Sequence, residues 1–137
     1  MPRHDDDGIP PEATLIRAVL PDWITSEDGT ERLNSKTFRD GLLEASCFIS
    51  EEVGGIEGFR RTILPRLEEE LGREILDVAI VSARDVRAHE LWIYRKPEEF
   101  FGNAAHVVIC PPAGVSKSQY AKRTGRLAND ARRESAK

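Results

Sequence analysis

His106 is the residue of this chain best suited to acid–base chemistry. It lies at the start of an apolar run, residues 105–110, and the loop residues Gly102 and Asn103 come just before that run. A histidine where a loop meets a strand can exchange protons near neutral pH, because its ordinary pKa is about 6.5. A single histidine is also common as a structural residue at the edge of a core. His106 is therefore the catalytic candidate, with a structural role as the alternative.

A second group of side chains would bind an anion if the fold brings it together. Arg32, Ser35 and Arg87 combine two guanidinium groups with one hydroxyl. Guanidinium presents a planar fork of donors that matches phosphate or carboxylate. In the alternative, Ser35 caps a turn and the two arginines pair with surface acids, an arrangement that implies no function.

Charge is divided unevenly along the chain. The net charge is −4, yet residues 116–137 carry seven lysines and arginines against two acids, a local charge of +5 that leaves −9 for residues 1–115. An acidic body with a basic end can contact nucleic acid, an acidic partner or a second copy of itself. The residues predicted to make this contact are Lys117, Tyr120, Lys122, Arg123 and Arg126. Tyr120 is expected to stack on a base; the alternative is a solvated helix that only aids solubility.

Metal, thiol and membrane chemistry find little support. Cys47 and Cys110 lie far apart in apolar runs, as is typical of buried, reduced thiols in a cytoplasmic protein. No Cys-x-x-Cys pair is present and the three histidines are scattered, so no metal site and no cofactor are predicted. No apolar run approaches the ~20 residues of a transmembrane helix. We expect a cytoplasmic protein without membrane contact.

The helices and strands that the sequence predicts would position these residues in one compact α+β domain. In it, one or two helices pack on a small mixed sheet. Four apolar runs predict strands, at residues 44–50, 75–82, 91–95 and 105–110. The run at 75–82 is nearly continuous, so that strand is expected to be buried on both faces. Residues 14–20 are apolar but too few to separate helix from strand by periodicity.

One amphipathic helix is predicted over residues 56–71. Phe59, Ile63, Leu67 and Leu71 recur at every fourth position, which places them on one helix face. Pro65 interrupts this pattern, so we expect either a kink or two short helices, the second with Pro65 in its first turn.

The domain boundaries follow from composition. Residues 1–13, with an aspartate run and several Gly and Pro, are predicted to be a disordered arm. Residues 14–115 form the α+β domain, and residues 116–137 a basic C-terminal helix or tail. Ser116 is expected to be the N-cap of that helix.

Two of these motifs also carry a resemblance. Residues 32–38 are similar to an Arg-Pro-Ser-Ser-x-x-Phe element of small uncharacterised bacterial proteins, in which a strand comparable to residues 45–49 follows. Residues 103–107 resemble the later Asn-Pro-Ala-His-Ala strand of the same proteins. This chain departs from the family pattern at Leu33, Asn34, Ala104 and Val107. The resemblance spans about residues 15–110, and it implies that the side chains to test together are Arg32, Ser35, Arg87 and His106.

Two functions are compatible with these features. The first is a cytoplasmic, non-catalytic binding or adaptor module, for instance in a bacterial operon assembly, whose basic C-terminal helix contacts nucleic acid or an acidic protein. The alternative is a small enzyme acting on a phosphorylated or nucleic-acid substrate, in which Arg32 and Arg87 bind the anion and His106 is the acid or base. The sequence does not predict an oligomeric state.

Overall fold

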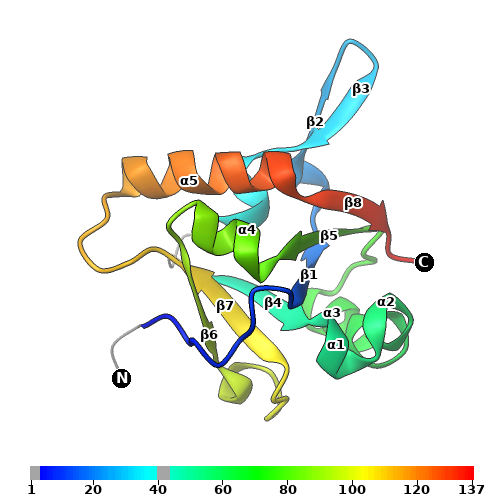
Figure 1. Cartoon of the computed structure of the whole chain (residues 1–137). Helices are drawn as coiled ribbons and strands as arrows, with labels where there is room; N and C mark the ends of the chain where they lie inside the picture. The colour runs from blue at the N-terminus through cyan, green and yellow to red at the C-terminus, as the bar shows by residue number, and fades with distance from the viewer. Residues whose placement is uncertain (1–3, 40–43) are drawn as a thin grey trace.

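A six-stranded sheet forms the centre of the molecule (Figure 1). The structure is a computed structural model that describes residues 4–39 and 44–137. Its strand order is β6-β7-β4-β1-β5-β8. The strands are β1 (Thr14–Val19), β4 (Ala45–Ile49), β5 (Asp77–Ser82), β6 (Trp92–Arg95), β7 (His106–Cys110) and β8 (Arg132–Ser135). The predicted α+β class is confirmed. The sheet is antiparallel rather than mixed, since every strand of it runs opposite to its neighbours.

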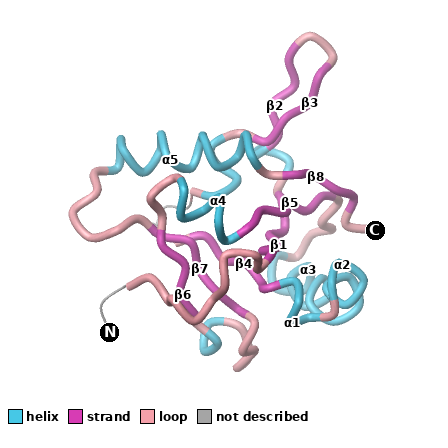
Figure 2. The backbone as a smooth tube through the Cα atoms, in the orientation of Figure 1, coloured by secondary structure: helices cyan, strands magenta, loops and turns pink. Residues whose placement is uncertain are grey.

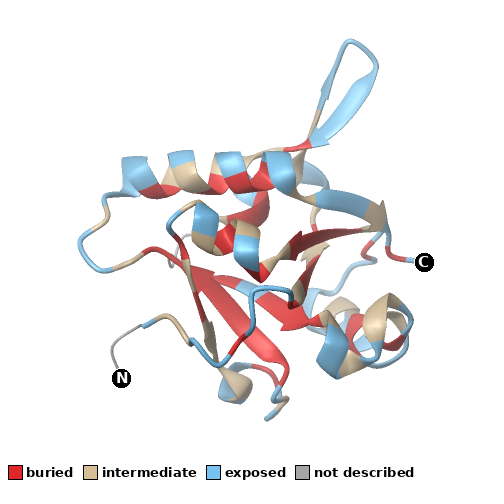
Figure 3. Cartoon of the chain, in the orientation of Figure 1, coloured by how far each residue is buried: buried red, intermediate tan, exposed pale blue. Residues whose placement is uncertain are grey.

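A two-stranded hairpin projects from this body. It consists of β2 (Ile24–Glu27) and β3 (Thr30–Leu33), and it extends away from the sheet as an arm that is exposed along most of its length (Figures 2 and 3). Asp28 and Gly29 form its two-residue turn with φ of 50° and 78°. Such a turn needs positive φ at both positions, which an Asp-Gly pair supplies.

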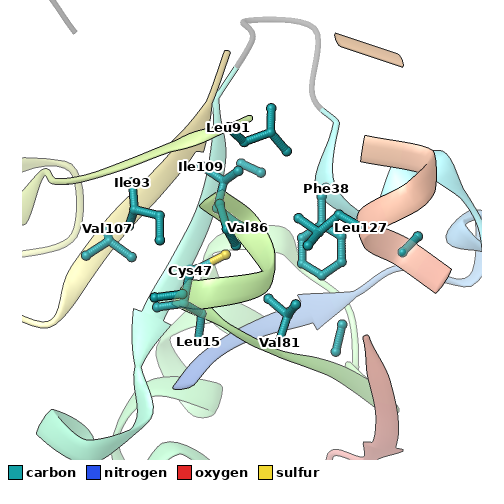
Figure 4. Packing of buried hydrophobic residues seen from close by; sticks show 14 of the residues in the cluster. Leu15, Phe38, Cys47, Val81, Val86, Leu91, Ile93, Val107, Ile109 and Leu127 are labelled. Atoms are coloured by element: carbon teal, nitrogen blue, oxygen red, sulfur yellow. The ribbon is translucent and has the colours of Figure 1, made fainter. Parts of the chain in front are cut away.

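One face of the sheet is covered by α4 (Ala83–Ala88), α5 (Lys117–Asp130) and a short 3-10 turn, η2 (Ser35–Phe38); we call it the closed face. Alternate strand residues such as Leu15, Cys47 and Val81 point toward these helices and interlock with Phe38 and Leu127 (Figure 4). Strand side chains alternate between the two faces, so each strand supplies every second residue to this core. The core is closed and strongly apolar.

Helix α5 starts as the sequence indicates. The Ser116 hydroxyl accepts a hydrogen bond from the Gln119 N–H at 3.1 Å, and the Gln119 side chain accepts one from the Ser116 N–H at 3.2 Å. This reciprocal pair is a capping box, which satisfies two donors at a helix start. The predicted N-cap at Ser116 is confirmed.

The opposite face carries short helices and we call it the open face. The elements are α1 (Ser50–Val53), α2 (Gly55–Gly58), a π-helical turn (Phe59–Ile63) and α3 (Leu64–Leu71). Pro65 lies in the first turn of α3, just after the π-helical turn, and the backbone is helical on both sides of it, so the segment is not divided into two separate helices. Gly72 ends α3 with φ of 65°, a left-handed cap that glycine adopts without strain. The helix predicted over residues 56–71 is found, since the backbone is helical from Gly55 to Leu71 with a π-helical turn inside it.

The two ends of the chain pack on the domain. The predicted basic C-terminal helix or tail stops being helical after Asp130, and β8 pairs with β5 at the edge of the sheet. The Arg60 guanidinium donates to the carbonyl oxygens of Ser135 and Ala136, which fixes this last strand. Residues 1–3 of the predicted arm lie outside the described residues. Its remainder follows β6 and α4, and Ile9 is fully buried in the closed-face core.

Candidate ligand pocket

A pocket of about 560 Å³ opens between α3, the strands β1 and β4, and the loop before β7. Its apolar wall includes Phe48 from β4, Leu67 from α3 and Phe100 from the loop. These residues belong to the core of the open face, so the pocket is a part of that core that the short helices leave uncovered. Its volume lies within the range of roughly 300–1,000 Å³ that is usual for small-molecule sites.

His106 lies in the wall of this pocket. It is the first residue of β7 and stands opposite Phe48 in the sheet, and its ring contacts those of Phe48 and Phe100, which also contact each other. Only 2% of the residue is exposed. Its Nδ1 is 2.6 Å from the carbonyl oxygen of Lys96. A carbonyl only accepts, so Nδ1 carries the proton and Nε2 offers a lone pair. In the described part of the chain, no group hydrogen-bonds to Nε2.

The environment of His106 favours its neutral form. Burial lowers the pKa of the imidazole below its ordinary 6.5, and this effect outweighs the hydrogen bond to Lys96 and the nearby Glu98 and Glu99. The ring is therefore uncharged at neutral pH. It can accept a hydrogen bond or a proton at Nε2, and it cannot donate one from that atom.

Arg17 bridges two strands at the inner end of the pocket. Strands β1 and β4 pair only at Leu15–Ile49 and Ile16–Phe48. One residue further, the Arg17 guanidinium donates to the Ser46 carbonyl oxygen at 2.7 Å and to the carbonyl oxygen of Thr37. It also lies over the ring of Trp23, 4.6 Å from the centroid. These contacts hold the buried cation in place and use several of its donors internally.

Acidic side chains surround the outer part of the pocket. Glu70 comes from α3, whereas Glu98 and Glu99 come from the short turn Pro97–Glu99. Glu99 is paired with Lys96 at 2.6 Å. In the described residues, neither Glu70 nor Glu98 forms an ion pair, and both are exposed. The outer part of the pocket thus holds two carboxylates without an ion-pair partner among the described residues.

Two exposed apolar side chains stand at the mouth. Leu71 at the end of α3 is 48% exposed and Phe101 in the loop is 61% exposed. Phe101 has φ of 51°, a left-handed conformation that costs a non-glycine residue of order 1–3 kcal/mol. Its ring also separates the pocket from a neighbouring hollow of about 270 Å³ beside Arg66. A strained and exposed aromatic residue at a pocket mouth is typical of a functional site.

The structure does not bring together the four residues that the sequence grouped around an anion. Only His106 reaches the pocket. Arg32 lies on the exposed hairpin 3.5 Å from Glu27, and Ser35 begins the turn η2 beneath α5. Arg87 lies on α4, where it holds the N-terminal segment through Asp5 and through the carbonyl oxygens of Asp6 and Ile9. The two arginines therefore stabilise separate surface regions.

The predicted contact residues of the basic segment fall into three classes. Tyr120 is buried and its hydroxyl donates to the Phe38 carbonyl oxygen at 3.1 Å, so its ring is not exposed to stack on a base. Arg123 pairs with Glu90 at 3.2 Å. The remaining three, all exposed on α5 and without an ion pair among the described residues, are Lys117, Lys122 and Arg126.

Most of the pocket was not predicted from the sequence. Of the residues that line it, His106 is the functional candidate from the sequence, and no local pattern points to Arg17. A local signal does exist in residues 96–101, where two acids and two phenylalanines follow a Lys-Pro pair just ahead of the His106 strand. Adjacent acidic and aromatic residues in one loop suit a mixed polar and apolar site.

Comparisons with protein-family models, with curated proteins and with solved structures found no match. The resemblance at residues 32–38 and 103–107 therefore stays a prediction. Within residues 4–39 and 44–137, no helix combines the length and apolar character needed to cross a membrane. Across the same ranges, no three His, Cys, Asp or Glu side chains are grouped to hold a metal ion.

Proposed function

We propose that this chain is a binding module that takes the apolar part of an organic ligand into the pocket on its open face. The observation that carries the proposal is His106, which is buried in the pocket wall with Nε2 unbonded among the described residues. A small number of placed polar groups beside an apolar wall is the usual way in which a small-molecule site orients its ligand, and His106 is such a group. The exposed Leu71 and Phe101 would close over the ligand's outer part.

The enzyme reading loses support in this geometry. It needs Arg32 and Arg87 beside His106 to bind a phosphorylated substrate, and both arginines are engaged elsewhere. The carboxylates of Glu70 and Glu98 would also repel a phosphate that approached the mouth. Binding without turnover is therefore the function that we favour for this pocket.

A neutral fluorescent probe tests the proposal without involving charge. N-phenyl-1-naphthylamine becomes bright in an apolar site, and we expect a saturable signal with one probe per chain. Ser46 is exposed and lines the pocket, so Ser46→Phe should fill the space and weaken binding at least tenfold, an estimate of roughly 1.4 kcal/mol. Ser26 is an exposed serine on the hairpin, and Ser26→Phe is the matched control. Absence of probe binding, or equal binding by both variants, would overturn the proposal.

A second candidate function is contact with nucleic acid or an acidic protein through α5. It is favoured by the three exposed cations without ion pairs among the described residues, of which Lys122 and Arg126 lie one helical turn apart. Cations that are not neutralised within the chain remain available to attract phosphates. Both buried cysteines are free thiols, which suits a reducing compartment. We therefore propose that the protein works in the cytoplasm, whichever of the two functions it has.

This second function is tested with a labelled single-stranded RNA of mixed sequence. Anisotropy should show binding that weakens steeply with salt, since phosphate contacts release counterions. The double variant Lys122→Glu/Arg126→Glu should abolish it. The control is Arg61→Glu/Arg73→Glu, which makes the same charge change on the open face. Arg61 is exposed in the π-helical turn, and Arg73 is exposed just after α3. Binding that both variants lose equally would indicate a response to net charge, and it would count against a site on α5.

A further inference from the structure

We propose that the pocket on the open face selects an organic cation, a primary amine or guanidinium group attached to an apolar or aromatic body. This inference rests on the proposed binding function and names the chemical class of the ligand. It follows from three features of the pocket: the carboxylates at its mouth, the hydrogen-bond acceptor Nε2 of His106, and its aromatic wall.

Two carboxylates at the mouth lack an ion-pair partner among the described residues, whereas the Arg66 guanidinium, which lies on the Phe101 ring, lines the neighbouring hollow and not this pocket. Glu70 and Glu98 form no ion pair there, while Glu99 shares Lys96 with Glu44. The positive charge of Arg17 lies 93% buried at the inner end, against Trp23 and two backbone carbonyls. A cationic group at the mouth therefore meets carboxylates, whereas an anionic group meets repulsion.

His106 offers the pocket an accessible acceptor, since every fully buried side-chain nitrogen and oxygen among the described residues already has a hydrogen-bond partner. The carbonyl oxygen of Lys96 fixes the proton of His106 on Nδ1, so Nε2 offers only a lone pair. An N–H group satisfies that lone pair, and a carboxylate or phosphate oxygen does not. Burial of an unsatisfied acceptor is costly, so a ligand that fills the pocket without a donor should bind more weakly.

The aromatic wall suits the same ligand class. Phe48, Phe100 and Trp23 line the pocket. At its mouth, the ring of Phe101 already carries a cation, since the Arg66 guanidinium lies 4.7 Å from the ring centroid. Aromatic faces attract cations by roughly 0.5–2 kcal/mol depending on solvent exposure. Aromatic rings and carboxylates together are the groups that recognise amines.

Three probes with one apolar body separate charge from shape: 3-phenylpropylamine, 3-phenylpropan-1-ol and 3-phenylpropanoate. Binding is followed by tryptophan fluorescence in the variant Trp92→Phe, in which Trp23 of the pocket wall is the only tryptophan left. We expect the amine to bind about tenfold more tightly than the alcohol, and the carboxylate most weakly. Equal binding of amine and alcohol, or tightest binding of the carboxylate, would overturn the cation preference and leave the binding function standing. If neither these probes nor the neutral naphthylamine bind, the function itself fails.

Variants at the mouth attribute the preference to its carboxylates. Glu70→Gln combined with Glu98→Gln should reduce the amine-to-alcohol ratio from about tenfold to about twofold. Glu69 is exposed beside Glu70 on α3 but does not line the pocket, so Glu69→Gln is the matched control. An unchanged ratio in the double variant, or an equal fall in the control, would contradict the assignment. Both residues are exposed, so the variants should fold.

Discussion

The two faces of the sheet differ in how completely the helices cover them. On the closed face, α5 runs for 14 residues and lays Tyr120, Thr124, Leu127 and Ala128 into the core. On the open face, the segment from Gly55 to Leu71 is also helical throughout, with a π-helical turn at Phe59–Ile63, yet a pocket remains between α3, β1 and β4. Each face carries an apolar core, and this pocket lies on the open face.

Buried polar groups follow the same division. On the closed face, burial raises the pKa of the Cys47 thiol to about 12, so this sulfur is an inert part of the core. On the open face, His106 is equally buried but keeps one ring nitrogen directed to the pocket. The Cys47 thiol thus needs no ligand, whereas the His106 imidazole can accept a hydrogen bond from one.

The largest expected effect compares a leucine from each face. Leu127→Ala leaves a cavity in the closed core and should cost about 2–5 kcal/mol of unfolding free energy, because Leu127 is fully buried. Leu71→Ala at the pocket mouth should cost less than about 0.5 kcal/mol, yet it should weaken binding of the naphthylamine probe. Urea unfolding monitored by circular dichroism measures the first effect. Equal destabilisation by the two variants would remove the distinction between the faces.

A smaller effect is expected at Arg87, whose three contacts tie the N-terminal segment and its buried Ile9 to the closed face. Arg87→Ala should cost about 1.5–3 kcal/mol, since charged hydrogen bonds are lost, and should speed proteolysis of residues 4–13. Arg32→Ala is the matched control, because the sequence predicts the same anion-binding role for Arg32 and Arg87. Arg32 is exposed on the hairpin, and its loss should cost less than about 0.5 kcal/mol. A protected segment in the Arg87 variant would contradict this role.

The sequence predicts what periodicity encodes. The four predicted strands, the helix over residues 56–71 and the cap at Ser116 all depend on neighbours in the chain, and all are found. Strand β8 was missed because Arg132–Ser135 is short and polar, and it becomes a strand only through the edge of β5 and the hydrogen bonds from Arg60. Tertiary context decides such a segment.

The pocket depends on contacts that no local pattern reveals. Arg17 and His106 are 89 positions apart in the numbering and meet because β1, β4 and β7 are neighbours in the sheet. The sequence singled out His106 from its place at a strand end, but it grouped it with Arg32 and Arg87 on residue type alone. Residue type does not specify direction, and both arginines lie on other surfaces.

The pH dependence of stability should report His106. In the unfolded chain the imidazole gains its proton as the pH falls through about 6.5. Burial lowers the pKa in the folded state, so between the two values the unfolded state binds more protons. Stability from this residue is therefore complete above pH 6.5 and declines below it. Urea midpoints at pH 7.5 and 5.5 should differ more in the wild type than in His106→Gln. His4→Gln, at an exposed position, should retain the wild-type difference; a wild-type slope in His106→Gln would contradict the assignment.

The smallest change in stability is expected at Phe101, where a variant tests whether a strained residue of the open face contributes to binding rather than to stability. Phe101 combines an exposed ring with φ of 51°, so Phe101→Gly removes backbone strain while adding flexibility to the unfolded chain. These effects oppose each other and nearly cancel if the strain is about 1 kcal/mol, so the unfolding free energy should then change by less than about 0.5 kcal/mol. Binding of 3-phenylpropylamine should nevertheless weaken severalfold, because the pocket loses the ring at its mouth. A clear loss of stability with unchanged binding would mean that Phe101 serves the fold, and the division between the faces would not extend to the mouth.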